Sequence, residues 1–152
     1  MIERLEQLTD ESAALHNKLL IIVGPTGTRK SALLSDLGQR RDATVLNVGS
    51  ELGRRLASLP VKQRSLAAPT VLRELADQHT ANGLLLLDNL ELIFDRTLQL
   101  DPLDLLKQLA RSRRVISVWP GVLRNERLIY AEMGHPEHQD YGLEGLVSFE
   151  IH

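Results

Sequence analysis

The sequence predicts an α/β protein, a three-layer α/β/α sandwich around a mostly parallel five-stranded sheet. Short apolar runs recur along the chain, and segments with helical spacing of apolar residues separate them. Residues 84–87 are four consecutive leucines, and unbroken hydrophobicity indicates a strand that helices cover on both faces, as in a parallel sheet. Alternation of strands and helices favours right-handed crossovers. Because the 152 residues contain no repeat and no long linker, residues 1–152 are expected to form one domain.

The first part of the chain is expected to begin with a helix that packs beside the first strand. Its apolar residues recur at near-helical spacing. The expected elements are a helix over residues 1–16, a strand over 19–23, a helix from Ala32 with Gly38 as its end signal, a strand over 44–48, and a helix from its cap Ser50 to about Leu59, stopped by Pro60.

The middle of the chain carries the leucine strand and one further strand. The expected elements are a basic irregular segment over residues 61–68, a helix capped by Thr70 that ends near Gly83, the strand 84–87, a short loop or turn over 89–95, a helix from Asp101 to about Arg113, and a strand over 115–119. Beyond Val122 the pattern is weaker. Residues 127–132 fit either a helix or a strand, and residues 145–151 resemble a final strand.

Composition indicates a soluble, cytoplasmic protein. Hydrophobic residues make up 43% of the chain and charged residues 25%, which is ordinary for a globular domain. The absence of cysteine excludes disulfides and thiolate metal sites and is typical of a reducing compartment. The first residues have no uninterrupted apolar core, so no signal peptide is expected. No apolar run approaches the roughly 20 residues of a membrane helix, so no membrane contact is expected.

Residues 18–31, KLLIIVGPTGTRKS, have the order of a phosphate-binding P-loop: strand, glycine turn, Lys-Ser and helix. In such a loop, backbone N–H groups and the helix N-terminus form a nest for phosphates. Lys30 is expected to reach the β- and γ-phosphates and to act in catalysis, and the Ser31 hydroxyl to bind Mg²⁺. The expected nucleotide-binding residues are Gly24, Pro25, Thr26, Gly27, Thr28, Arg29, Lys30 and Ser31.

Arg29 stands where the pattern G-x-x-x-x-G-K-[ST] has a glycine. Glycine there allows a left-handed backbone or a close approach to phosphate. A side chain in left-handed geometry costs roughly 1–2 kcal/mol, which a bound triphosphate would offset. Two alternatives stay open: an ordinary glycine turn, and a degenerate loop that folds correctly but binds nucleotide weakly.

A second group of candidate residues follows the leucine strand. Asp88 ends that strand and is expected to hold the Mg²⁺ shell. Glu91 is the nearest carboxylate that would position the attacking water, and Asn89 is a less direct candidate for that catalytic role. The alternatives are that Asp88 caps the turn after the strand and that Glu91 is an ordinary acidic loop residue.

With GPTGTRKS and LLLLDNLE, the chain resembles the additional-strand class of P-loop NTPases, near the AAA+ and STAND ATPases. This resemblance implies that strand 115–119 lies between the P-loop strand and the strand of Asp88, with Ser117 as a weak candidate for a polar sensor. The usual residue after the strand aspartate is glutamate in that class, whereas this chain has Asn89. No helical lid follows the last expected strand, so a sensor arginine is absent or comes from another chain. Candidates for such an arginine are Arg111, Arg113, Arg114, Arg124 and Arg127.

The small size, the DNLELIFD and SVWPG segments and the stretch around GHPEH are similar to the BrxF family, the small P-loop proteins of BREX phage-defence systems. This resemblance implies a Mg²⁺-dependent ATPase that works with other defence-system subunits. ATP is favoured over GTP by the resemblance, and no N-K-x-D motif for guanine is present. Self-association and an indirect contact with DNA stay open, as does a kinase activity, for which no acceptor site is evident.

Charge is unevenly distributed, although the net charge is only −2. Residues 40–73 carry seven basic side chains against two acidic ones, and residues 88–104 are mainly acidic. This polarity is typical of a solvated surface, but it also fits a docking face. The alternative function is therefore a non-hydrolysing P-loop-fold scaffold that docks DNA or a partner subunit through residues 40–73. Trp119 is expected in the core, and His135 and His138 are expected to be loop residues without metal.

Overall fold

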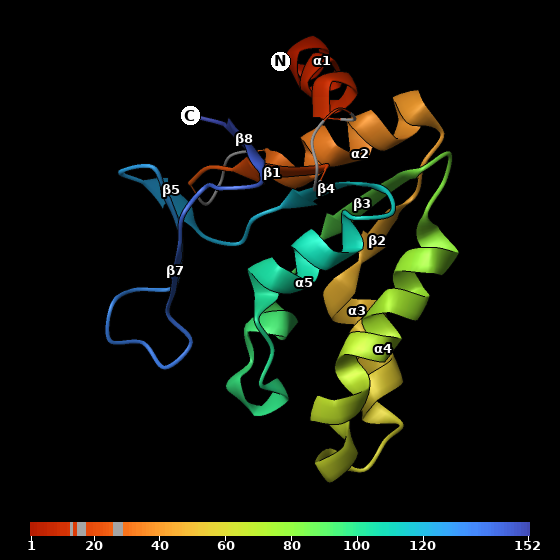
Figure 1. Ribbon diagram of the computed structural model, residues 1–152, viewed down its shortest axis with the longest axis vertical. Coiled ribbons are helices and arrows are strands. Elements are labelled where there is room, and N and C mark those ends of the chain that lie inside the picture. The colour runs from red at the N-terminus through yellow and green to blue at the C-terminus, as the bar shows by residue number, and fades with distance from the viewer. Residues whose placement is uncertain (13, 15–17, 26–28) are drawn as a thin grey trace.

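The computed structural model describes residues 1–12, 14, 18–25 and 29–152 (Figure 1). The helices in this part of the chain are α1 (Ile2–Ser12), α2 (Lys30–Arg41), α3 (Val48–Ala57), α4 (Val61–His79) and α5 (Pro102–Leu109), with the 3-10 turns η1 (Glu91–Phe94) and η2 (Arg96–Leu98). The strands are β1 (Leu19–Val23), β2 (Val45–Asn47), β3 (Leu84–Asp88), β4 (Arg114–Val118), β5 (Val122–Arg124), β6 (Arg127–Tyr130), β7 (Gln139–Tyr141) and β8 (Val147–Glu150).

The main sheet has five parallel strands in the order β2-β3-β4-β1-β8. Ile116 of β4 pairs with Leu20 of β1 on one side and with Leu86 of β3 on the other. The strand that ends in Asp88 is therefore separated from β1 by one intervening strand, as the resemblance to the additional-strand class implied. The parallel five-stranded sheet was predicted correctly.

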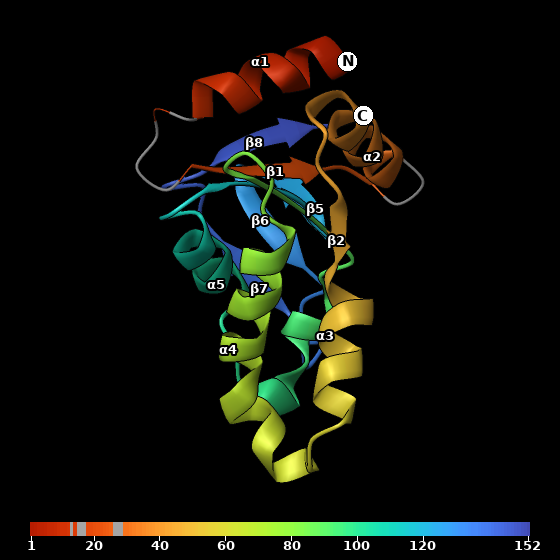
Figure 2. The same cartoon turned by 90° about the vertical axis from the view of Figure 1, so that its right-hand side faces the viewer.

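Helices cover both faces of this sheet, which confirms the three-layer α/β/α architecture (Figures 1 and 2). α1 and α2 pack on one face, where Leu5, Leu34 and Leu37 join a buried apolar cluster with alternate strand residues. α3, α4, α5 and η1 pack on the opposite face in a second cluster. The five residues of β1 are fully buried, because both layers cover this strand, and burial of each large apolar side chain stabilises the fold by about 1.5–3 kcal/mol.

One long helix, α4, replaces the irregular segment expected over residues 61–68, and Thr70 is not a cap. α4 begins directly after Pro60 and continues through Pro69. A proline inside a helix removes one backbone hydrogen bond and costs about 3 kcal/mol. Packing offsets that cost, since buried residues lie on both sides of Pro69, from Ala68 to Ala76, and α4 packs along α3 (Figure 2).

Gly38 does not end its helix, contrary to the expectation. α2 continues to Arg41, and the turn follows at Asp42, whose φ is +53°. Gly38 is buried, and a Cβ on it would lie 2.5 Å from the Ala43 carbonyl oxygen. The glycine is therefore required because the chain passes close to the helix after the turn.

Three other element boundaries differ from the sequence-based expectation. Asn47, rather than Ser50, caps α3: its side chain accepts a hydrogen bond from the Ser50 backbone N–H at 3.0 Å. α5 ends at Leu109 rather than near Arg113. Residues 127–132 contain the strand β6, and β5, β6 and β7 form a separate three-stranded antiparallel sheet, called the small sheet below. In the described part of the chain, no helix combines the length and the apolar character needed to cross a bilayer.

Candidate functional site

The carboxyl ends of three neighbouring strands and the start of α2 surround a depression of about 420 Å³. β2, β3 and β4 end here, and open parallel sheets bind ligands at this edge. We call it the strand-end depression. Its lining residues are Lys30, Ser31, Asn47, Asp88, Asn89, Glu91, Val118, Trp119 and Pro120. The structure therefore brings together five of the predicted site residues: Lys30, Ser31, Asp88, Asn89 and Glu91.

Lys30 begins α2, and backbone carbonyls hold its side chain at the ends of two strands. The Nζ atom donates a hydrogen bond to the Gly24 carbonyl oxygen at 2.8 Å and another to the Trp119 carbonyl oxygen at 3.3 Å. Burial lowers the pKa of the Lys30 ammonium, while the negative charges of Glu91 and Asp88 oppose that shift. Both carboxylates thus act electrostatically on the lysine. One cation and two anions lie in the same depression.

The rest of the predicted loop is only partly described. Gly24 is buried directly after β1, and Ser31 is exposed in the first turn of α2. Thr26, Gly27 and Thr28 lie outside the described residues, so their expected backbone contacts with phosphate stay a prediction. Pro25 is exposed.

Arg29 differs from the expectation in two respects. Its φ is −85° and its ψ is 49°, so the backbone is not left-handed and the predicted strain of a side chain there is absent. Arg29 also lines a different depression, on the side of α2 that faces the start of α1, together with Met1 and Asp36. The Arg29 side chain is not among the residues that line the strand-end depression. Its backbone carbonyl accepts the Leu33 N–H at 2.9 Å and so begins the helix.

Asp88 and Glu91 face the strand-end depression from β3 and from η1. One oxygen of Asp88 accepts the Asn89 backbone N–H at 2.8 Å, so Asp88 does cap its own turn, as one alternative suggested. Its second oxygen has no hydrogen bond within the described chain. Glu91 is exposed at the first position of η1. Both carboxylates are therefore accessible to a ligand in the depression.

Asn89 serves as a connector between β3 and α3. Its φ is +58°, its Nδ2 atom donates to Asn47 Oδ1 at 2.9 Å, and its carbonyl oxygen accepts the Gly49 N–H at 3.0 Å. A Cβ on Gly49 would lie 2.5 Å from Asn89 Nδ2. Sequence reasoning missed Asn47 and Gly49, although Asn47 ends a parallel strand and this position alone would have placed it at the same edge.

The polar sensor expected at Ser117 is not in the strand-end depression. Ser117 is fully buried in the middle of the sheet, and its neighbours in the adjacent strands are Ile21 and Leu87. Val118, Trp119 and Pro120 occupy the end of β4 instead. Trp119 is completely buried, which confirms that it belongs to the core. Its backbone carbonyl, rather than a polar side chain, faces Lys30.

None of the five candidate arginines lines the strand-end depression. Three of them form ion pairs within the chain: Arg113 with Asp77 at 2.9 Å, Arg114 with Asp10 at 3.8 Å, and Arg127 with Asp140. Arg111 and Arg124 have no ion pair among the described residues. An arginine that reaches the depression would therefore have to come from another molecule or from a rearrangement.

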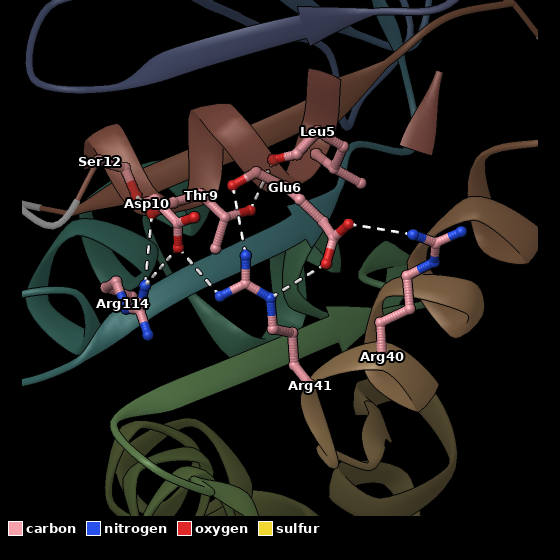
Figure 3. A network of polar contacts seen from close by, with 8 residues as sticks. All are labelled: Leu5, Glu6, Thr9, Asp10, Ser12, Arg40, Arg41 and Arg114. Atoms are coloured by element: carbon pink, nitrogen blue, oxygen red, sulfur yellow. Dashed lines mark hydrogen bonds and ion pairs between the residues drawn. The ribbon is translucent and has the colours of Figure 1, made fainter. Parts of the chain in front are cut away.

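The basic segment 40–73 does not form one continuous surface. Arg40 and Arg41 lie on α2 and bind α1: Glu6 pairs with both, at 3.1 and 3.4 Å, and Asp10 pairs with Arg41 at 3.0 Å (Figure 3). The other basic residues lie on α3 and α4, on the opposite face of the sheet. There, Arg54 pairs with Glu51 and Arg55 with Glu74. Much of the positive charge is thus already neutralised.

No family model matches the sequence, and no curated protein matches it either. Among solved structures, AMPPCP-bound DnaA from Aquifex aeolicus is similar over 75% of this chain, at 19% sequence identity and a TM-score of 0.41. PCH-2 from C. elegans is similar over 98% of this chain, at 17% identity and a TM-score of 0.43. The chain spans 35% and 40% of the lengths of these two proteins. Both likenesses are weak. The strand order therefore defines the fold, and the strand-end depression defines the candidate site.

Proposed function

We propose that this chain binds ATP with Mg²⁺ in the strand-end depression and hydrolyses it slowly in the absence of a partner. One observation carries the proposal. The ammonium of Lys30 lies at the ends of β1 and β4, in the same depression as the carboxylates of Asp88 and Glu91. A lysine that follows a glycine turn, at the start of a helix and opposite a strand-end aspartate, is the arrangement that P-loop NTPases use for phosphate.

The side chains present fit a magnesium ion. Mg²⁺ prefers oxygen ligands and usually takes one or two from the protein and the rest from phosphates and water. Ser31 and Asp88 supply a hydroxyl and a carboxylate in one depression, and the second oxygen of Asp88 is available. When bound, the ion would neutralise phosphate charge. Ser31 and Asp88 would hold it, and Lys30 would exchange its carbonyl partners for phosphate oxygens.

Glu91 is the residue that we assign to the attacking water. It is exposed, lies in the depression and carries a negative charge that acts on Lys30. A carboxylate in this position accepts a proton or a hydrogen bond from water. Asn89 is a weaker choice because its amide nitrogen already donates to Asn47. ATP is preferred over GTP by the resemblance to the BrxF family, and the sequence has no guanine-reading N-K-x-D motif.

The proposal extends to an assembly, and the resemblance to the BrxF family supports it. We propose that the chain acts with other phage-defence subunits in the cytoplasm, that self-association contributes, and that any contact with DNA is indirect. The pairing of Arg40 and Arg41 with α1 argues against residues 40–73 as a single docking surface.

A non-hydrolysing scaffold is the second candidate, and one observation favours it. Lys30 has two carbonyl acceptors within the chain, so the P-loop fold satisfies its lysine without nucleotide. In that case the loop would serve as structure alone.

Calorimetric titration with ATP, with Mg²⁺ and with a chelator, separates the two candidates. We expect Mg²⁺-dependent binding that Lys30→Ala abolishes while the melting temperature without ligand is retained. Lys62→Ala is the matched control, because Lys62 is exposed on α4, away from the depression. Saturating nucleotide at 100 times the Kd should stabilise the fold by about 2.7 kcal/mol. Absence of binding and of stabilisation by any nucleotide would leave the scaffold.

A further inference from the structure

Trp119 joins the strand-end depression to the small sheet. Its backbone N–H donates to the Ile22 carbonyl oxygen of β1 at 2.8 Å, and its own carbonyl oxygen accepts from Lys30 Nζ at 3.3 Å. At the other end of the residue, the indole Nε1–H donates to the Ile129 carbonyl oxygen of β6 at 3.1 Å. One fully buried residue thus contacts the phosphate-binding lysine through its main chain and the small sheet through its side chain.

Aromatic contacts hold the indole ring in place. The ring packs edge-on against Phe94, with 5.4 Å between ring centroids, and against Tyr141, with 5.9 Å. Phe94 also stacks on Tyr130 at 3.8 Å. Tyr130 and Tyr141 belong to β6 and β7, and Phe94 ends η1, the turn that begins with Glu91. The ring cluster therefore connects the small sheet with two segments. One carries the Trp119 carbonyl oxygen, which accepts from Lys30, and the other is η1, which begins with Glu91.

The backbone after Trp119 lies directly against β6. Gly121 lies so close to β6 that a Cβ on it would collide with the Ile129 carbonyl oxygen. The same carbonyl accepts the indole hydrogen bond. β6 therefore contacts this segment at both Trp119 and Gly121, and its position bears on the position of the Trp119 peptide.

We propose that Trp119 is a positioning residue for Lys30. β6 fixes the indole, the fixed residue presents its carbonyl oxygen to the ammonium, and the small sheet thereby sets where Lys30 rests. The proposal rests on the nucleotide-binding function. When phosphate draws Lys30 away from the Trp119 carbonyl oxygen, the change at Trp119 reaches the small sheet that holds its indole. A contact made on the small sheet then changes nucleotide affinity.

Trp119 is the only tryptophan in the chain, so its fluorescence reports this contact directly. We expect a change in Trp119 emission on titration with Mg²⁺-ATP, with the same Kd that calorimetry gives. Lys30→Met keeps a long side chain without the ammonium. It should shift the emission of the ligand-free protein and abolish the response to ATP. These measurements on the native tryptophan do not require that any Trp119 variant folds.

Two variants test the positioning role. Trp119→Phe keeps an aromatic ring but removes the Nε1–H donor. Because the Trp119 carbonyl holds Lys30 only in the ligand-free protein, loosening it should lower the Kd for Mg²⁺-ATP by about threefold to tenfold, the range for loss of one hydrogen bond. Tyr141→Phe is the matched control: it keeps the ring beside Trp119 and removes only the hydroxyl that contacts Asp101 at 3.3 Å. Its Kd should match the native value.

The emission of Trp119 separates positioning from a general structural role, because a response to Mg²⁺-ATP requires a link between Lys30 and the indole. If ATP binds but the emission of the native protein and the Kd of Trp119→Phe are both unaffected, the positioning role is wrong and the proposed function stands. If calorimetry detects no ATP binding, the function fails, and the ligand-free emission of Lys30→Met still tests the resting contact.

Discussion

Replacement of Arg29 by glycine restores the residue that the P-loop pattern has at this position, and the structure predicts little effect on nucleotide affinity. If Arg29 were strained in left-handed geometry, relief of roughly 1–2 kcal/mol would tighten binding by about 5- to 30-fold. The observed φ of −85° leaves no such strain to relieve. The Arg29 side chain also lines the depression beside Met1 rather than the one that holds Lys30. We therefore expect the Kd of Arg29→Gly for Mg²⁺-ATP to stay within about twofold of the native value, a change of less than about 0.5 kcal/mol.

Calorimetry with three proteins tests this expectation. Arg29→Gly is compared with the native chain and with Arg29→Ala, which removes the guanidinium but keeps a Cβ. A gain of tenfold or more in Arg29→Gly alone would refute the backbone argument, because only the glycine can adopt the left-handed geometry without cost. An equal loss in both variants would mean that the guanidinium contacts phosphate in the bound state.

Three further predictions follow from the structure. Asp88→Asn should retain the fold but reduce the dependence of ATP affinity on Mg²⁺, measured by calorimetry with and without the metal; unchanged Mg²⁺ dependence would exclude Asp88 as a ligand. Gly49→Ala places a methyl group 2.5 Å from Asn89 Nδ2 and should lower the free energy of unfolding by about 1–3 kcal/mol in urea titrations, whereas Gly53→Ala, with 3.6 Å to its nearest neighbour, should not destabilise. The hydrogen bond from Arg41 holds the pKa of Asp10 below its ordinary value of 3.8. Because the folded-state pKa of Asp10 is lower than its ordinary value, this ion pair stabilises the docking of α1 above the ordinary pKa. The stabilisation is lost as the pH falls through the lowered pKa. Melting temperatures measured against pH should therefore show a smaller acid dependence in Arg41→Met.

Local sequence signals predicted the fold well wherever one segment determines its own structure. The bounds of β1 match the expected strand, and β3 differs from its prediction by one residue, Asp88. Two of the errors arose where distant segments decide. Gly38 reads as a stop signal, yet contact with Ala43 explains it. Residues 61–68 were expected to be irregular, yet packing along α3 keeps α4 continuous through Pro69.

The candidate site shows the same division. Lys30, Ser31 and Asp88 follow from motifs a few residues long, and the structure brings them to one depression. Gly49 and the Trp119 carbonyl have no local signature, because each acts through a partner far away in the chain. Ser117 was expected to face the ligand from its place near a strand end, but side chains of a strand alternate between its two faces, and both neighbouring strands enclose it.

The charges around the strand-end depression bear on how fast this chain would hydrolyse ATP alone. Within the described chain, Lys30 is the only cation that lines the depression, and Asp88 and Glu91 oppose it with two negative charges. A triphosphate adds further negative charge, so binding without Mg²⁺ is electrostatically unfavourable. In phosphoryl transfer, an additional arginine supplied by a partner is worth a factor of 10³–10⁵ in kcat. None of the five candidate arginines lines the depression in the described part of the chain, so under the proposed function rapid hydrolysis would require an arginine from another molecule or from a rearrangement.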